Sequence, residues 1–174
     1  MEERRQQLLR LIDRAFDGVT LGDGVSLHES KVIDGYGSSE ERLAARGPDE
    51  KTDWHRLIDD PDLTLYFGIG YGGLCFLDAA GVRFHLPACM YRAVRDKLDD
   101  DVSSRSGGNG VCDMFESMFL LLTDQDEYNL SRYTLLSNEQ RACVRECLVF
   151  FRTELQIDDD ALNLAIDYWS HSAS

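Results

Sequence analysis

The chain has 174 residues, with 18 Lys and Arg against 32 Asp and Glu, so its formal net charge is −14. This length is typical of one compact domain. No apolar run approaches the roughly 20 residues that a membrane-spanning helix needs, and MEERRQQLLR at the N-terminus lacks the apolar core of a secretion signal. The acidic balance argues against direct binding to nucleic acid. We therefore expect a single acidic domain over residues 1–174, located in the cytoplasm.

The first third of the chain is expected to be helical. Apolar residues between positions 8 and 16 recur at helical spacing, which predicts an amphipathic helix that ends at Gly18. Two later pairs have the spacing of a capping box and predict short helices over 26–34 and 38–46. These pairs are Ser26 with Glu29 and Ser38 with Glu41. Pro61 then suits the first turn of a further helix that extends to Phe67.

The middle of the chain has a different pattern. Residues 74–77 (LCFL) are apolar, residues 78–81 (DAAG) are typical of a turn, and residues 82–86 (VRFHL) alternate apolar with polar side chains. This order predicts a β-hairpin with Val82, Phe84 and Leu86 on one face. Pro87 then suits the first turn of a helix that reaches Leu98.

The last third of the chain again indicates helices. Residues 103–110 (SSRSGGNG) predict a flexible polar loop, and residues 114–122 suit a buried helix. Ser137 and Gln140 have capping-box spacing for a helix that extends to about Leu155, and a final helix begins at Asp158. The predicted fold class is therefore α+β, predominantly α-helical, with seven to eight helices and one small β-hairpin.

Motifs for cofactors and metals are incomplete. Residues 68–73 match G-x-G-x-x-G, but the pattern that follows is a strand and a turn rather than the helix of a dinucleotide site. Cys143 and Cys147 stand at i,i+4 on a helix and are expected to be buried thiols. The four histidines form no Cys/His cluster with metal-ligand spacing. We therefore expect neither a cofactor nor a metal.

One set of polar residues could form an enzyme site. Asp78 and His85 are predicted on opposite arms of the hairpin, where they could approach one another. With Asp53 and Arg83 they would surround a hydrolase-like pocket beside residues 74–86, although no G-x-S-x-G elbow supplies a serine nucleophile. The alternative for His85 is an imidazole that faces solvent or a partner.

The charge itself suggests a binding function. A net charge of −14 exceeds the magnitude of about 2 to 8 that solubility usually needs in a small domain. Solubility alone is one explanation, and a basic protein partner is the other. The main hypothesis is a non-enzymatic protein-binding module, an acidic immunity protein that neutralises a basic toxin domain such as a nuclease. Its candidate contact residues are Asp99, Asp100, Asp101, Asp124, Asp126 and Glu127, with Trp54 and Tyr91 as apolar anchors.

Three segments together resemble a known family. They are LCFLDAAGVRFHLPA (74–88), DEKTDW (49–54) and YTLLSNEQRACVRECLVFF (133–151). The chain is similar to a family of uncharacterised, mainly bacterial proteins over about residues 16–169, and departs from it at 68–73 and at Cys89-Met90. The resemblance implies no reaction, cofactor or catalytic residue. Compact acidic domains of this kind are often immunity proteins encoded beside toxins, which is an association rather than a residue-level argument.

Overall fold

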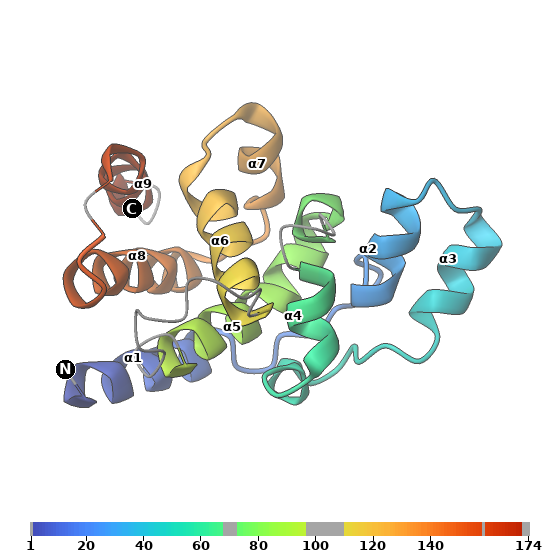
Figure 1. Cartoon of the computed structure of the whole chain (residues 1–174), viewed down its shortest axis with the longest axis horizontal. Coiled ribbons are helices and arrows are strands. Elements are labelled where there is room, and N and C mark those ends of the chain that lie inside the picture. Colours follow the sequence, from blue (N-terminus) through green and yellow to red (C-terminus); the bar gives the residue numbers. More distant parts are fainter. Residues whose placement is uncertain (1, 68–72, 97–109, 158, 172–174) are drawn as a thin grey trace.

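A computed structural model describes residues 2–67, 73–96, 110–157 and 159–171, and within these ranges the chain is helical without any β-strand (Figure 1). The predicted loop at 103–110 and the glycine-rich segment 68–73 lie almost wholly outside the described residues. The described α-helices are α1 (Glu2–Ala15), α2 (Leu27–Asp34), α3 (Ser39–Arg46), α4 (Pro61–Phe67), α5 (Ala79–Asp96), α6 (Gly110–Thr123), α7 (Glu127–Arg132), α8 (Asn138–Glu154) and α9 (Asp160–His171). Two 3-10 helices, η1 (Trp54–Leu57) and η2 (Gly73–Phe76), stand between them.

The predicted capping boxes are confirmed at α2, α3 and α8. In each, the side chain of the third helical residue accepts a hydrogen bond from the main-chain N–H of the N-cap residue. This bond measures 3.3 Å for Glu29 on Ser26, 2.7 Å for Glu41 on Ser38 and 3.0 Å for Gln140 on Ser137. Local side-chain chemistry therefore sets where these helices begin.

The predicted β-hairpin, and with it the α+β class, is wrong. Residues 79–96 form the continuous helix α5, and the 78–81 segment expected as a turn is its beginning. The Asp78 carboxylate caps this helix by accepting from the main-chain N–H of Gly81 at 2.8 Å. An aspartate that precedes two alanines is a helix start as readily as a turn. Pro87, expected in the first turn of a later helix, lies inside α5 instead.

The alternation of apolar and polar residues at 82–86 predicted a strand wrongly, because α5 is buried on nearly every side. Helices α1, α6 and α7 and the 3-10 helix η1 pack against it (Figure 1). A helix covered in this way is apolar all round, so its sequence lacks the polar face that gives an amphipathic helix its period. Its buried residues are Gly81, Val82, Phe84, His85, Leu86, Pro87, Ala88, Cys89, Met90, Ala93 and Val94.

The start of α5 packs closely on the turn that precedes α2. A Cβ added at Gly81 would lie 2.7 Å from the Val25 carbonyl oxygen, and one added at Gly24 would lie 2.8 Å from the Gly81 nitrogen. A side chain at either position would therefore clash with the other segment. The Asp78 carboxylate ties the same two segments together by accepting from the Val25 N–H at 3.0 Å. The absence of side chains on both glycines lets the backbones approach.

Helix α1 closes the core from the N-terminal side. Its apolar stripe, which includes the predicted Leu8, Ile12 and Ala15, is buried against α5 and α8. Arg4 of α1 forms a 2.8 Å ion pair with Glu154 at the end of α8. Helix α1 is therefore held to α8 by both apolar and charged contacts.

We predict that Gly81→Ala destabilises the protein, because its Cβ would overlap the Val25 carbonyl oxygen and the backbone there cannot move aside cheaply. Overpacking of this kind costs about 1–3 kcal/mol in the free energy of unfolding. Gly35→Ala is the matched control, since its Cβ would meet nothing closer than 3.6 Å. Urea denaturation of both variants measures the difference, and equal stabilities would contradict the prediction.

Candidate functional site

The four residues of the predicted polar site do not form one cluster. Asp53 caps η1, and its carboxylate accepts from the main-chain N–H of His55 at 3.1 Å. Asp78 caps α5, Arg83 is half-buried on the same helix, and His85 is fully buried. Within the described ranges, no hydrogen bond or ion pair joins any two of the four. The fold therefore gives each of them a separate role.

His85 belongs to the core. Its Nδ1–H donates to the Gly81 carbonyl oxygen at 2.8 Å, and the rings of Phe67 and Phe84 stand edge-on to the imidazole. Its Nε2 has no hydrogen-bond partner among the described residues. Burial lowers the pKa of His85 to about 4, although the Gly81 carbonyl opposes the shift. The ring is therefore neutral at physiological pH.

The acidic segment before Trp54 builds a loop. The Glu50 carboxylate accepts from the main-chain N–H groups of Thr52, Lys51 and Asp53, at 2.7, 2.9 and 3.1 Å. Hydrogen bonds from Thr52, together with those from its neighbours, lower the pKa of Glu50 to about 2. The Trp54 indole is buried and donates to the Phe16 carbonyl oxygen at 3.0 Å. This ring, a predicted partner anchor, has no surface that a partner could contact.

His28 forms a polar centre that the sequence did not predict. Its Nδ1 is hydrogen-bonded to the Asp49 carboxylate, and its Nε2 lies 3.1 Å from the Asp62 carboxylate. Carboxylates accept hydrogen bonds, so this arrangement favours the charged imidazole, in which both ring nitrogens carry protons. The partners lie 21 and 34 residues away in the chain, and no local spacing announces such a contact.

The two carboxylates keep His28 protonated. Burial favours the neutral ring, but hydrogen bonds and charge from Asp49 and Asp62 outweigh it and raise the pKa of His28. Asp49 also accepts from the main-chain N–H of His28 at 3.0 Å, and its side chain is buried. With both ring nitrogens bonded, this centre holds α2, the 47–53 segment and α4 together and leaves no imidazole lone pair for chemistry.

The predicted partner contacts divide into three groups. Asp124, Asp126 and Glu127 are exposed at the junction of α6 and α7, where Asp126 caps α7 by accepting from the Asn129 N–H at 2.7 Å. Tyr91 is half-buried on α5, with its ring centroid 6.3 Å from that of Trp54. Asp99–Asp101 lie outside the described residues and stay a prediction.

Unpaired negative charge gathers in the C-terminal part of the chain. Residues 110–174 hold twelve Asp and Glu against four Arg. By contrast, buried Glu29 near the other end of the molecule is paired with both Arg42 and Arg46. We use the name acidic rim for six exposed carboxylates that form no ion pair with any residue the structure describes: Glu116, Asp124, Asp126, Glu127, Asp159 and Asp160.

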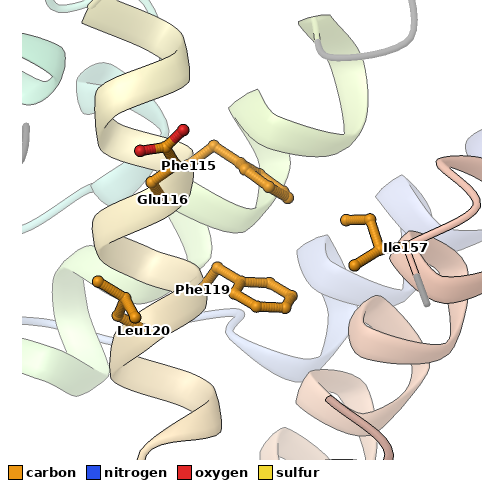
Figure 2. A pocket seen from close by; sticks show the side chains of 5 residues that line it. All are labelled: Phe115, Glu116, Phe119, Leu120 and Ile157. Carbon is orange, nitrogen blue, oxygen red and sulfur yellow. The ribbon is translucent and has the colours of Figure 1, made fainter. Parts of the chain in front are cut away.

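An apolar hollow of about 280 Å³, the α6 groove, adjoins this rim. In Figure 2 the rings of Phe115 and Phe119 point from α6 toward Ile157, whereas Leu120 lies at the opposite edge of the same helix in this view; Glu116 completes the lining. Apart from the Glu116 carboxylate, the lining side chains are hydrocarbon. Leu120 is 58% exposed. Sequence periodicity marked α6 as buried and did not reveal this open side.

Two further properties limit the classes of site. In the described part of the chain, no group of three or more His, Cys, Asp or Glu side chains is arranged to hold a metal ion. No helix there is long and apolar enough to cross a membrane. The predicted burial of Cys143 and Cys147 is confirmed, and burial raises the pKa of the Cys147 thiol.

Comparison with known proteins identifies the family. Residues 4–173 match a family of unknown function, DUF6714, so the chain belongs to that family. No curated protein and no solved structure matches the chain. Family membership therefore transfers no activity, and a function has to be argued from the geometry.

We predict that the His28 centre makes stability fall as pH rises. The folded-state pKa of His28 lies above the unfolded value near 6.5, so its contribution is complete below that value and is lost as pH rises through the folded pKa. Urea denaturation at pH values from 6 upward should show this loss, and His28→Gln should remove it. His171→Gln, at an exposed site on α9, is the control. A wild-type slope that His28→Gln leaves unchanged would contradict the assignment.

We predict that the burial of neutral His85 makes the stability of the protein fall at acidic pH. Its folded-state pKa of about 4 lies below the unfolded value near 6.5, so stability is lost as pH falls through this window. A shift of this size corresponds to about 3 kcal/mol. The expected measurement is a histidine NMR titration in which one imidazole stays neutral to about pH 4. An ordinary titration of all four rings near 6.5 would refute the buried neutral state.

Proposed function

We propose that this member of the DUF6714 family is a non-enzymatic module that binds a basic protein, and that it acts in the bacterial cytoplasm as an immunity protein. The observation that carries the proposal is the acidic rim, whose exposed carboxylates form no ion pair with any described residue and one of which, Glu116, lines the apolar α6 groove. The partner we propose is a cationic toxin domain such as a nuclease. An acidic protein can block the cationic cleft of such a toxin by taking the place of phosphate charge.

Charge and apolar contact would have separate tasks in this complex. Exposed ion pairs contribute only about 0–1 kcal/mol each, so the rim would chiefly accelerate association. Affinity requires apolar anchors, and Leu120, Tyr128 and Leu164 are each about half exposed or more. Tyr128 is held in place, because its hydroxyl donates to the Cys75 carbonyl oxygen at 2.6 Å and the Arg132 guanidinium lies 4.7 Å from its ring centroid.

The enzyme alternative receives no support from the geometry. Asp53 and Asp78 are occupied by main-chain N–H groups at helix starts, and His85 is enclosed by aromatic rings. The His28 centre uses both ring nitrogens in contacts with carboxylates. Neither set offers the accessible base and nucleophile that hydrolysis needs.

We predict that the triple variant Asp124→Asn, Asp126→Asn, Glu127→Gln slows association with the partner about tenfold, because electrostatic steering acts on the on-rate. Asn is also a good helix cap, so the change at position 126 keeps α7 capped. The partner is first captured from the native host with the wild-type protein. Association is then measured from about 50 mM to about 500 mM NaCl, where the wild-type rate should fall steeply.

The matched control removes the same charge elsewhere. Asp17→Asn, Asp23→Asn, Glu40→Gln changes three exposed carboxylates near the other end of the chain and should alter the rate little. Capture of acidic proteins alone, or equal association rates for both triple variants, would contradict the binding function. The captured protein should arrest growth when expressed alone and not when co-expressed with this chain. A harmless partner would overturn the immunity role.

A further inference from the structure

We infer that the α6 groove receives one face of a cationic amphipathic helix of the partner, with a large apolar side chain seated on Phe115, Phe119 and Ile157. This inference rests on the proposed function and names the part of the partner that is held. The size of the groove is the first reason. Its volume of about 280 Å³ is at the small end of the range for ligand pockets, and its lining is almost wholly hydrocarbon, which suits one or two apolar side chains.

The outer ridge of α6 supplies the second reason. Glu116, Leu120 and Asp124 are spaced i, i+4 and i+8, and all three are exposed. Residues with this spacing share one side of a helix, and the backbone positions of Glu116 and Asp124 are about 12 Å apart along the axis at about 1.5 Å per residue. Acidic groups therefore stand at both ends of an exposed leucine. A partner helix laid along this ridge would match it with Lys or Arg on either side of its apolar residue.

The segment that follows Ile157 in the chain has the same charge. Asp159 and Asp160 are both exposed, and the Asp159 carboxylate accepts main-chain N–H groups at the start of α9. Exposed carboxylates therefore lie on α6 and on the segment that leads from Ile157 into α9. Together with the net charge of −14, this favours a cationic occupant over a second copy of the chain, an anionic membrane or a nucleic acid, all of which would bring like charge to the rim.

The test uses two synthetic helical peptides of about 15 residues, with identical leucine positions and either Lys or Glu at all polar positions. We expect the Lys peptide to bind, and to shift the amide NMR signals of residues 115–120 and 157, whereas the Glu peptide does not bind. Calorimetry should show that Leu120→Asp and Glu116→Lys each weaken binding of the Lys peptide about tenfold or more.

Two control variants match these changes away from the groove. Leu43→Asp alters another leucine on α3, 69% exposed against 58% for Leu120, and Glu40→Lys reverses another exposed carboxylate. Both should bind the peptide about as tightly as the wild type. Equal weakening by the groove and control variants, or signal shifts confined to other residues, would overturn the inference. So would a wild-type dimer, detected by light scattering, that Leu120→Asp dissociates.

The native partner separates this inference from the proposed function. A partner that binds the wild type and is lost from Leu120→Asp supports both. A partner that binds Leu120→Asp as tightly as the wild type overturns the groove inference and leaves the binding function intact. Failure to capture any basic protein with the wild type contradicts the proposed function itself.

Discussion

The contact between the start of α5 and the turn before α2 is the constraint on which the rest of the structure depends. One carboxylate oxygen of Asp78 accepts from both the Gly81 N–H, which caps α5, and the Val25 N–H, which fixes the preceding turn. The glycines at 24 and 81 allow the two backbones to meet. Because α5 is the helix against which α1, α6 and α7 pack, this junction determines where the other helices can lie.

The burial of the central helix α5 also affects where the acidic side chains lie. Since α5 takes almost no charge into the core, the 32 acidic side chains lie mainly on the surrounding helices and loops. In the N-terminal part many of them are used structurally, as Asp49 and Asp62 are at His28 and Glu29 is with its two arginines. In the C-terminal part the six carboxylates of the acidic rim are exposed and form no ion pair with any described residue, although Asp126 and Asp159 also cap helices. The two parts of the chain thus use the same residue types differently.

Local signals predicted much of this fold, and non-local contacts explain what was missed. Ser26, Ser38 and Ser137 were identified as helix starts because a capping box involves only residues three apart. The segment 78–86 was wrongly predicted as a hairpin because other helices cover α5 on most sides. A helix covered in this way has no polar face, so its sequence lacks the usual helical period of apolar residues. His28 was missed because its partners are distant in the chain. The acidic residues of the α6–α7 junction were predicted as contacts, but the groove beside them depends on Ile157, which only the folded chain brings to Phe115.

The packing of α1 on α8 has a consequence for how the protein is made. The apolar side of α1 needs α8 for part of its cover, and Arg4 pairs with Glu154, which lies 150 residues further along the chain. At translation speeds of about 5–20 residues per second, α1 waits on the order of ten seconds between its own synthesis and that of α8. During this interval Leu8 and Ile12 are incompletely covered on the ribosome. The nascent chain therefore completes this part of its core only after α8 has been made, rather than growing it outward from α1.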